Sequence, residues 1–283
     1  FQEGTVQGEK RNPMRKLHVL GTGTAVVTKY LNTAFVLDNG TSYFLVDGMG
    51  GAEILRQFDR MKLDWSKLHY AFLSHKHTDH FLGMIWAIRY IAFQMCEGHY
   101  EGDFHLYCHT ELADKLRMVC RALLRSVECN QLDERVHFHI IQDGGREHIW
   151  NCDFTFFDIQ STKAKQFGFQ MVWPDGMKLV FPGDEPVSDS YRHYCTDADW
   201  LLSEAYCLYA DREIFTPYKY HHSTVREASL LAQECHVKNL VLWHTEDATF
   251  GTRTERYTAE AKQFFSGNIF VPKDGEVIKL PEL

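Results

Sequence analysis

The segment His75–His80 gathers the side chains of this sequence that are best suited to chemistry. It contains three imidazoles and one carboxylate within six residues, namely His75, His77, Asp79 and His80. The apolar run at residues 70–73 predicts a buried strand before the segment, and residues 81–95 predict a helix after it. The segment therefore lies at the C-terminal end of a strand, the structural context that a metal-binding motif needs.

These four side chains predict two ion sites. Residues two apart on an extended chain project to the same side, so His75 and His77 can converge on one ion. Asp79 and His80 lie on the turn into the helix and can serve a second ion nearby. Neutral imidazole and carboxylate suit zinc, manganese or iron(II). The alternative, a surface histidine cluster on a solvated turn, does not account for the flanking strand and helix.

The pattern His-x-His-x-Asp-His followed by Gly83 resembles the metallo-β-lactamase superfamily. The resemblance implies an α/β fold, an αββα sandwich of two mixed β-sheets flanked by helices, with one or two metals at the sheet edges. It implies that Asp184, after the strand 178–181, bridges the ions and that His244, at the end of the strand 240–243, is the last ligand. Antibiotic-cleaving members carry Cys at the position of Asp184, so a β-lactamase is not expected.

Two further segments resemble ribonuclease Z, and the match in order and spacing covers most of residues 17–246. Residues 200–205 contain Glu204, which in that family holds a catalytic histidine, and His222 opens the corresponding His-Ser/Thr segment. Thr224 also predicts an N-cap with Glu227 three residues on. Without the family context, Glu204 is equally well read as a satisfied buried carboxylate at a strand end.

The sequence departs from that family in two places. Superfamily members carry a third histidine after a later strand, here 153–159, and the corresponding residue is Gln160. An amide is a poor metal ligand compared with imidazole. The first ion site, that of His75 and His77, is therefore expected to bind metal weakly, to use water in place of the third histidine, or to recruit Asp158. Ribonuclease Z also inserts a long tRNA-gripping arm, whereas residues 167–177 predict only a hairpin that turns at residues 174–176.

Charge argues for a small anionic substrate and against tRNA. The formal net charge is −8, with 38 acidic and 30 basic residues, and no basic run appears. Nucleic-acid binding depends largely on Lys and Arg that neutralise phosphates. Lys163 and Lys165 form the basic pair near the expected mouth of the site. They could hold one anionic group of a small molecule, or they could simply be solvated.

Length and composition predict one globular domain over residues 14–283, and the resemblance implies that it is a metallo-β-lactamase-like hydrolase domain. Residues 1–13 are polar and unlike the rest, which suggests a tag or linker remnant with Met14 as the native start. No apolar run reaches the about 18 residues that span a bilayer, and no secretory signal precedes the first strand. The eight scattered cysteines are typical of reduced thiols in a cytoplasmic protein. The sequence does not decide whether the protein forms a homodimer.

Strands and helices alternate in two halves without a linker. The first half has strands near 17–27, 33–38, 42–47 and 68–74, then helices 81–96 and 111–125. The second half has strands near 136–141, 153–161, 168–173, 178–183 and 199–204, then helix 224–236, strand 239–244 and helix 255–266.

The expected chemistry is hydrolysis by metal-bound hydroxide at a centre of two divalent ions, zinc before manganese or iron. The predicted metal ligands are His75, His77, Asp79, His80, Asp184 and His244, and the predicted catalytic residues are Asp79, Glu204 and His222. The first hypothesis is a phosphodiesterase that acts on a small phosphodiester such as a cyclic nucleotide. The second is an ester, lactone or thioester hydrolase. The third, motivated by Gln160, is a non-catalytic or single-metal binding protein.

Overall fold

Fourteen strands form two seven-stranded sheets in the computed structural model, which describes residues 14–281. The first sheet has the order β14-β1-β2-β3-β4-β5-β6, with β1 Arg15–Gly21, β2 Ala34–Asp38, β3 Tyr43–Val46, β4 Leu68–Phe72, β5 Phe104–Cys108, β6 Val136–Ile140 and β14 Val277–Leu280. The second has the order β13-β12-β11-β10-β9-β8-β7, with β7 Gly145–Ile149, β8 Cys152–Asp158, β9 Phe167–Val172, β10 Lys178–Phe181, β11 Trp200–Glu204, β12 Asn239–Trp243 and β13 Asn268–Phe270. The expectation for residues 1–13 lies outside the described residues.

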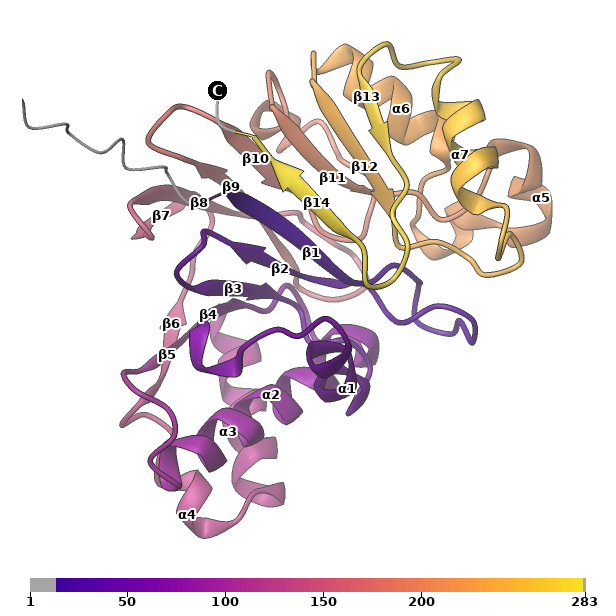
Figure 1. The fold of residues 1–283 in the computed structure, drawn as a ribbon. Coiled ribbons are helices and arrows are strands. Elements are labelled where there is room, and N and C mark those ends of the chain that lie inside the picture. The colour runs from indigo at the N-terminus through magenta and orange to yellow at the C-terminus, as the bar shows by residue number, and fades with distance from the viewer. Residues whose placement is uncertain (1–13, 282–283) are drawn as a thin grey trace, which may run out of the picture.

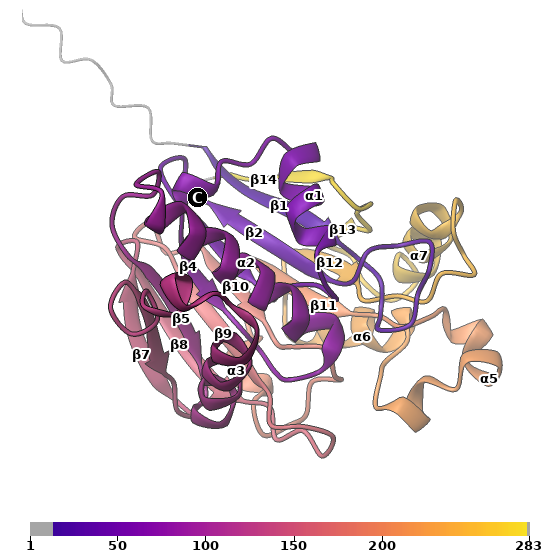
Figure 2. The same cartoon turned by 90° about the horizontal axis from the view of Figure 1, so that it is seen from below.

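Helices cover the outer faces of both sheets (Figures 1 and 2). The α-helices are α1 Glu53–Arg60, α2 Thr78–Cys96, α3 Thr110–Leu123, α4 Ser126–Cys129, α5 Arg212–Phe215, α6 Val225–Glu234 and α7 Arg253–Ala261. The short 3₁₀ turns are η1 Trp65–Lys67, η2 Arg192–Tyr194, η3 Tyr209–Asp211 and η4 Pro217–Tyr220. Both sheets mix parallel and antiparallel neighbours, which confirms the predicted αββα sandwich.

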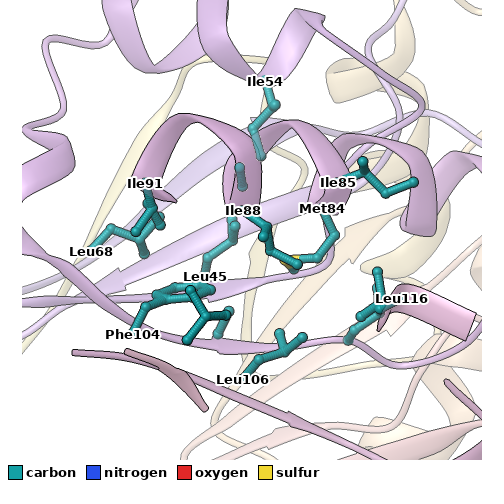
Figure 3. Close-up of a cluster of buried hydrophobic side chains, with 14 of the residues drawn as sticks. Leu45, Ile54, Leu68, Met84, Ile85, Ile88, Ile91, Phe104, Leu106 and Leu116 are labelled. Atoms are coloured by element: carbon teal, nitrogen blue, oxygen red, sulfur yellow. The ribbon is translucent and has the colours of Figure 1, made fainter. Parts of the chain in front are cut away.

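Apolar side chains fill three layers. Between the sheets, aromatic rings dominate: Phe44 lies 5.1 Å from Phe154, and Phe72 lies 5.5 Å from Phe156, measured between ring centroids. A second cluster joins the first sheet to α1, α2 and α3 (Figure 3). A third joins the second sheet to α6 and α7. Burial on both faces explains why these strands are nearly continuous apolar runs.

Two sequence predictions about element bounds are corrected. The strand expected over 17–27 ends at Gly21, because the backbone N–H groups of Thr22 and Gly23 both donate to the carbonyl of Leu31 and turn the chain aside. The segment between the strands expected near 136–141 and 153–161 contains a further strand, β7, whose Arg146, Glu147 and His148 are exposed and so show no apolar alternation in the sequence.

Candidate metal centre

The C-terminal ends of five strands position the residues of the candidate metal centre. Asp47 follows β3, His75 follows β4, Asp184 follows β10, Glu204 ends β11 and His244 follows β12, so all five stand at the C-terminal ends of parallel strands. Open α/β sheets place their ligand sites at such ends. The two sheets bring these edges together, and residues far apart in the sequence become neighbours.

Helix α2 begins inside the motif. His77 is its N-cap, and Asp79 and His80 lie in its first turn, earlier than the predicted start at residue 81. The carboxylate of Asp79 therefore lies at the positive end of the helix dipole. Close packing of α2 requires glycine: a Cβ on Gly83 would lie 1.6 Å from the carbonyl oxygen of Gly48. This contact holds the start of α2 against the end of β3.

The structure brings the six predicted ligands together in two groups. Their donor atoms lie within 4.8 Å of one another inside each group: His75, His77 and Asp184 form the first, and Asp79, His80 and His244 form the second. In the first group, His75 Nε2 lies 2.8 Å from His77 Nδ1. In the second, His80 Nε2 lies 3.1 Å from Asp79 Oδ2. Five of these side chains are buried, which excludes the solvated-turn alternative.

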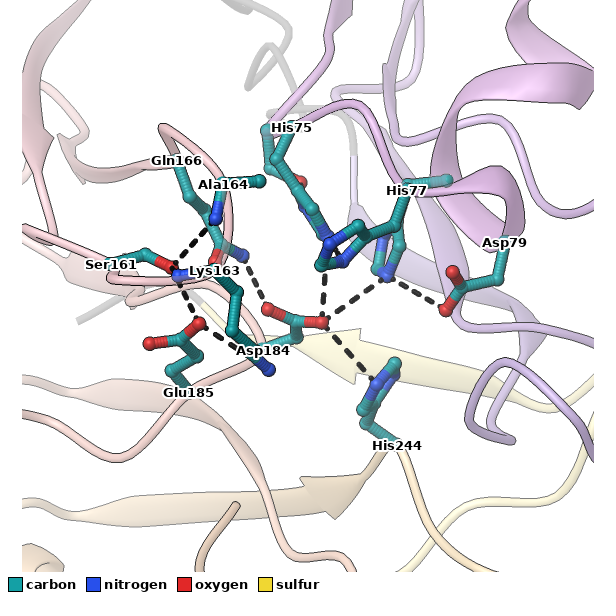
Figure 4. A network of polar contacts seen from close by, with 12 residues as sticks. His75, His77, Asp79, Ser161, Lys163, Ala164, Gln166, Asp184, Glu185 and His244 are labelled. Atoms are coloured by element: carbon teal, nitrogen blue, oxygen red, sulfur yellow. Dashed lines mark hydrogen bonds and ion pairs between the residues drawn. The ribbon is translucent and has the colours of Figure 1, made fainter. Parts of the chain in front are cut away.

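One oxygen of Asp184 lies between the two groups. Asp184 Oδ2 is 3.6 Å from His75 Nε2, 3.6 Å from His80 Nε2 and 3.5 Å from His244 Nε2 (Figure 4). An oxygen equidistant from imidazoles of both groups is placed as a bridging ligand would be.

A second layer of polar groups orients the imidazoles. His75 Nδ1 lies 2.9 Å from Ser74 Oγ, and His244 Nδ1 lies 3.1 Å from Thr33 Oγ1. Each hydroxyl already donates elsewhere, Ser74 to Asp47 and Thr33 to the Gly23 carbonyl, so each accepts from the imidazole. The Nε2 lone pairs of both rings are thereby free to face the centre, the usual arrangement around metal-binding histidines.

Asp47 orients the imidazole of His80 in the same way, through its Nδ1. Its Oδ2 lies 2.7 Å from His80 Nδ1, while buried His80 Nε2 has no hydrogen-bond partner among the described residues. A buried orphan nitrogen aimed at two carboxylates fits a cation. Burial alone would lower the pKa of His80, but Asp79 and Asp47 outweigh it and raise the pKa well above its usual value. An ion at Nε2 would take the place of that proton.

The remaining ligands have the charge states that metal binding requires. Burial lowers the pKa of His75 well below its usual value and lowers the pKa of His244 to about 3. Burial would raise the pKa of Asp184, but His75, His80 and His244 together hold it well below its usual range. Neutral imidazoles and an ionised carboxylate at neutral pH are the ligand forms of these groups.

The prediction for Gln160 is corrected. Its side chain is exposed, its backbone is left-handed with φ 59°, and its N–H donates to Asp158 Oδ1. Neither residue belongs to the two donor groups or lines the cavity over them. The glutamine that touches the centre is Gln166, whose Nε2 lies 2.6 Å from Asp184 Oδ1. No pattern in the sequence indicated Gln166, since residues 160–166 form a loop whose path only the fold determines.

Glu204 and His222 form a buried ion pair beside the centre. Glu204 Oε2 lies 3.4 Å from His222 Nδ1, and its Oε1 accepts the Ser223 N–H at 2.6 Å. Burial lowers the pKa of His222, but the carboxylate of Glu204 more than offsets this, and the net shift is upward. His222 and His244 have ring centroids 5.4 Å apart. An imidazole whose pKa is raised beside the metal ligands is suited to donate a proton there.

Thr224 N-caps α6 as predicted. Its side chain and the N3 residue Glu227 form the complete capping box. Because this cap fixes the first turn of α6, it also fixes the chain entering it, and the backbone N–H of His222 donates to the Pro217 carbonyl. The cap thereby holds His222 at the site.

A cavity of about 950 Å³ opens over both groups and over His222. Three lysines line it, namely Lys76, Lys163 and Lys219, together with the aromatic rings of Tyr206 and Tyr220. Lys163 Nζ lies 3.3 Å from Glu185 Oε1 and donates to the Tyr220 carbonyl at the cavity wall, whereas Lys165 lies 3.8 Å from Asp158 and does not line the cavity. The cavity has the size of a small-molecule site.

The chain has the metallo-β-lactamase fold, and each of its two ligand groups could hold a metal ion. The chain belongs to the family described as "Anti-Pycsar protein Apyc1", whose model matches residues 15–265.

Ribonuclease Z enzymes are among its curated relatives, which confirms the predicted likeness. The protein from Thermococcus sibiricus is 25% identical over 308 residues, covering 95% of this chain and 97% of the relative. That from Parabacteroides distasonis is 23% identical over 305 residues, covering 89% and 95%.

Solved structures show the same fold. The metallo-β-lactamase fold protein YhfI from Bacillus subtilis matches with a TM-score of 0.72 and 21% identity, covering 94% of this chain and 99% of that one. The short form of human tRNase Z matches with a TM-score of 0.70 and 22% identity over the same shares. None of the helices between residues 14 and 281 has the length and apolar character that crossing a membrane requires.

Proposed function

We propose that this protein is a two-metal phosphodiesterase that hydrolyses a small phosphodiester such as a cyclic nucleotide. The observation that carries the proposal is the position of Asp184 Oδ2 between two groups of ligands, with His222, which is paired with Glu204, lining the cavity over them. Two-metal centres of this kind are typical of phosphoryl-transfer hydrolases. The family name describes an anti-Pycsar protein, and we propose that this chain shares that role.

His75 and His77 would hold the first ion, Asp79, His80 and His244 the second, and Asp184 both. Zinc is the proposed metal, because imidazole and carboxylate donors suit it. When bound, the ions lower the pKa of coordinated water and polarise the phosphoryl oxygen.

His222 would protonate the leaving alkoxide. Its Nδ1 faces Glu204, so the proton on Nε2 is the one available to a substrate in the cavity. Glu204 is itself fixed by the Ser223 N–H and keeps the ring in one orientation. A phosphodiester with a poor leaving group needs this proton, whereas an activated aryl ester needs it little.

The cavity favours a small anion over tRNA. Lys76, Lys163 and Lys219 line the cavity wall, the first two within 3.4 Å of the carboxylates of Glu111 and Glu185, while the whole chain carries a net charge of −8. Strands β9 and β10 are joined by residues 173–177 alone, so no arm is inserted in that hairpin. The non-catalytic alternative rested on Gln160 in place of a third histidine; Gln160 lies outside the cavity lining, and among the described residues the first donor group contains two histidines and Asp184.

The test is a substrate panel with metal-depleted protein reloaded with Zn²⁺ or Mn²⁺. The panel contains bis(p-nitrophenyl) phosphate, 3′,5′-cyclic nucleotides, and lactone and thioester substrates. We expect metal-dependent hydrolysis of the phosphodiesters, including at least one cyclic nucleotide. Turnover of lactones or thioesters with none of any phosphodiester would replace the proposal with a carbonyl hydrolase.

A further inference from the structure

Gln166 is a buried amide pressed against the bridging carboxylate. It lies directly before β9, the residue is 1% exposed, and its Nε2 lies 2.6 Å from Asp184 Oδ1 (Figure 4). The amide must present its nitrogen to Asp184, because an amide oxygen at this distance would face a carboxylate oxygen without a proton between them. Gln166 therefore donates, and Asp184 Oδ1 accepts.

The two oxygens of Asp184 consequently have different surroundings. Oδ1 is taken by Gln166, while Oδ2 faces His75, His80 and His244 at 3.5–3.6 Å. Without a donor on Oδ1, the carboxylate could rotate about its last bond and offer one oxygen to each ion.

Backbone contacts hold Gln166 in this place. Its carbonyl accepts the N–H of Ile159 at 3.0 Å, and the N–H of Phe167 donates to the carbonyl of Ser74 at 3.1 Å. The loop is thus tied to the residue that precedes His75. On the other side stands Gly183, whose φ is +90° and on which a Cβ would lie 2.9 Å from Gln166 Nε2. The absence of a side chain at this position leaves room for the amide.

We propose that Gln166 is a positioning residue that restricts Asp184 to bridging both ions through the single oxygen Oδ2. The inference rests on the proposed two-metal centre and concerns how the centre is assembled. Because both ions would share Oδ2, a loss of its orientation would weaken both sites together. Residues that orient metal ligands in this way typically contribute about 10–100-fold to metal affinity.

The experiment compares Gln166→Met with Gln57→Met. Methionine keeps the length of the side chain and removes the donor. Gln57 is a matched control, since it is also buried and its Nε2 donates to the Leu20 carbonyl at 2.9 Å, which is not part of the centre. Zn²⁺ affinity and stoichiometry are measured by competition with a chromophoric chelator. The thermal midpoint in excess EDTA reports the stability of the metal-free protein.

We expect Gln166→Met to weaken Zn²⁺ binding at both sites by about 10–100-fold, and Gln57→Met to leave it unchanged. A Gln166→Met protein that binds two Zn²⁺ with wild-type affinity would overturn the inference. A wild-type protein that binds no Zn²⁺ would instead overturn the proposed function.

A second variant keeps the test open if Gln166→Met does not fold. Gln166→Asn retains the amide but shortens the side chain by one methylene, so the donor no longer reaches Oδ1. It should lose affinity in the same direction, and wild-type affinity in this variant would also contradict the role of the hydrogen bond.

Discussion

The ring of Tyr206 lies flat against the imidazole of His222, with centroids 5.0 Å apart and planes 5° apart. His222 is therefore held on one edge by Glu204 and on one face by Tyr206. Both rings line the cavity over the ligand groups. A ring fixed in both ways keeps its second nitrogen aimed at one place, which a general acid requires.

Removing the His222 side chain should lower turnover far more for substrates with poor leaving groups than for activated ones. His222→Ala should lower turnover of an unactivated phosphodiester by about 10²–10⁴-fold, the usual contribution of a general acid, and should lower turnover of bis(p-nitrophenyl) phosphate much less. Glu204→Gln should show a smaller loss of the same kind, with metal content unchanged. Equal losses on both substrates would identify His222 as a binding or structural residue instead.

The stacked ring should matter more than its hydroxyl. Tyr206→Phe preserves the stack and should keep turnover near the wild-type level. Tyr206→Leu should reduce turnover of an unactivated phosphodiester by up to about 10-fold, because an aromatic pair contributes about 0.5–1.5 kcal/mol. Steady-state kinetics at saturating substrate check this. An equal loss of turnover in both variants would mean that the hydroxyl, and not the stacked ring, acts on the reaction.

The raised pKa of His222 predicts the pH dependence on poor leaving groups. The acid must be protonated, and because its pKa is raised, the protonated form persists further toward neutral pH than in a free histidine. Turnover should fall as pH rises through this pKa. Glu204→Gln removes the main partner that raises the pKa, so the falling limb should move to lower pH. A limb that stays at the same pH in this variant would belong to another group.

Metal removal should destabilise the protein. Ions that bind only the folded state add about 2.7 kcal/mol when their free concentration is 100 times Kd, and a chelator removes this contribution. The thermal midpoint should therefore drop in EDTA and recover with added Zn²⁺, and elemental analysis of untreated protein should find a transition metal. His75→Ala should show a much smaller EDTA effect, whereas the control His148→Ala, an exposed imidazole away from the centre, should respond like wild type. No transition metal and an unchanged midpoint would contradict the metal centre.

Local signals in the sequence predicted the core elements, and they failed where the signal was weak. Strand β4 was recognisable as the start of a short apolar run, and helix α2 as a long, mostly apolar segment. Strand β7 escaped because it is an edge strand with polar, exposed residues. Strand β14 was also missed, because its pairing with β1 joins residues more than 250 positions apart, which no local pattern reports.

The sequence by itself determined which side chains could bind ions. The spacing of His75, His77, Asp79 and His80 places them on one strand end and one helix turn, and short-range backbone geometry is enough for that. The positions of Asp184 and His244 followed from resemblance to a family and not from spacing.

Only the tertiary structure decided how these side chains are oriented. The partners Asp47, Gln166 and Tyr206 come from separate strands and loops, and each acts through a contact of 2.6–5.0 Å with a residue far away in the chain. Such contacts depend on the packing of two sheets against each other, because a loop such as residues 160–166 has no periodicity that would reveal its path. For that reason the sequence indicated Gln160, and the folded chain places Gln166 against the bridging carboxylate.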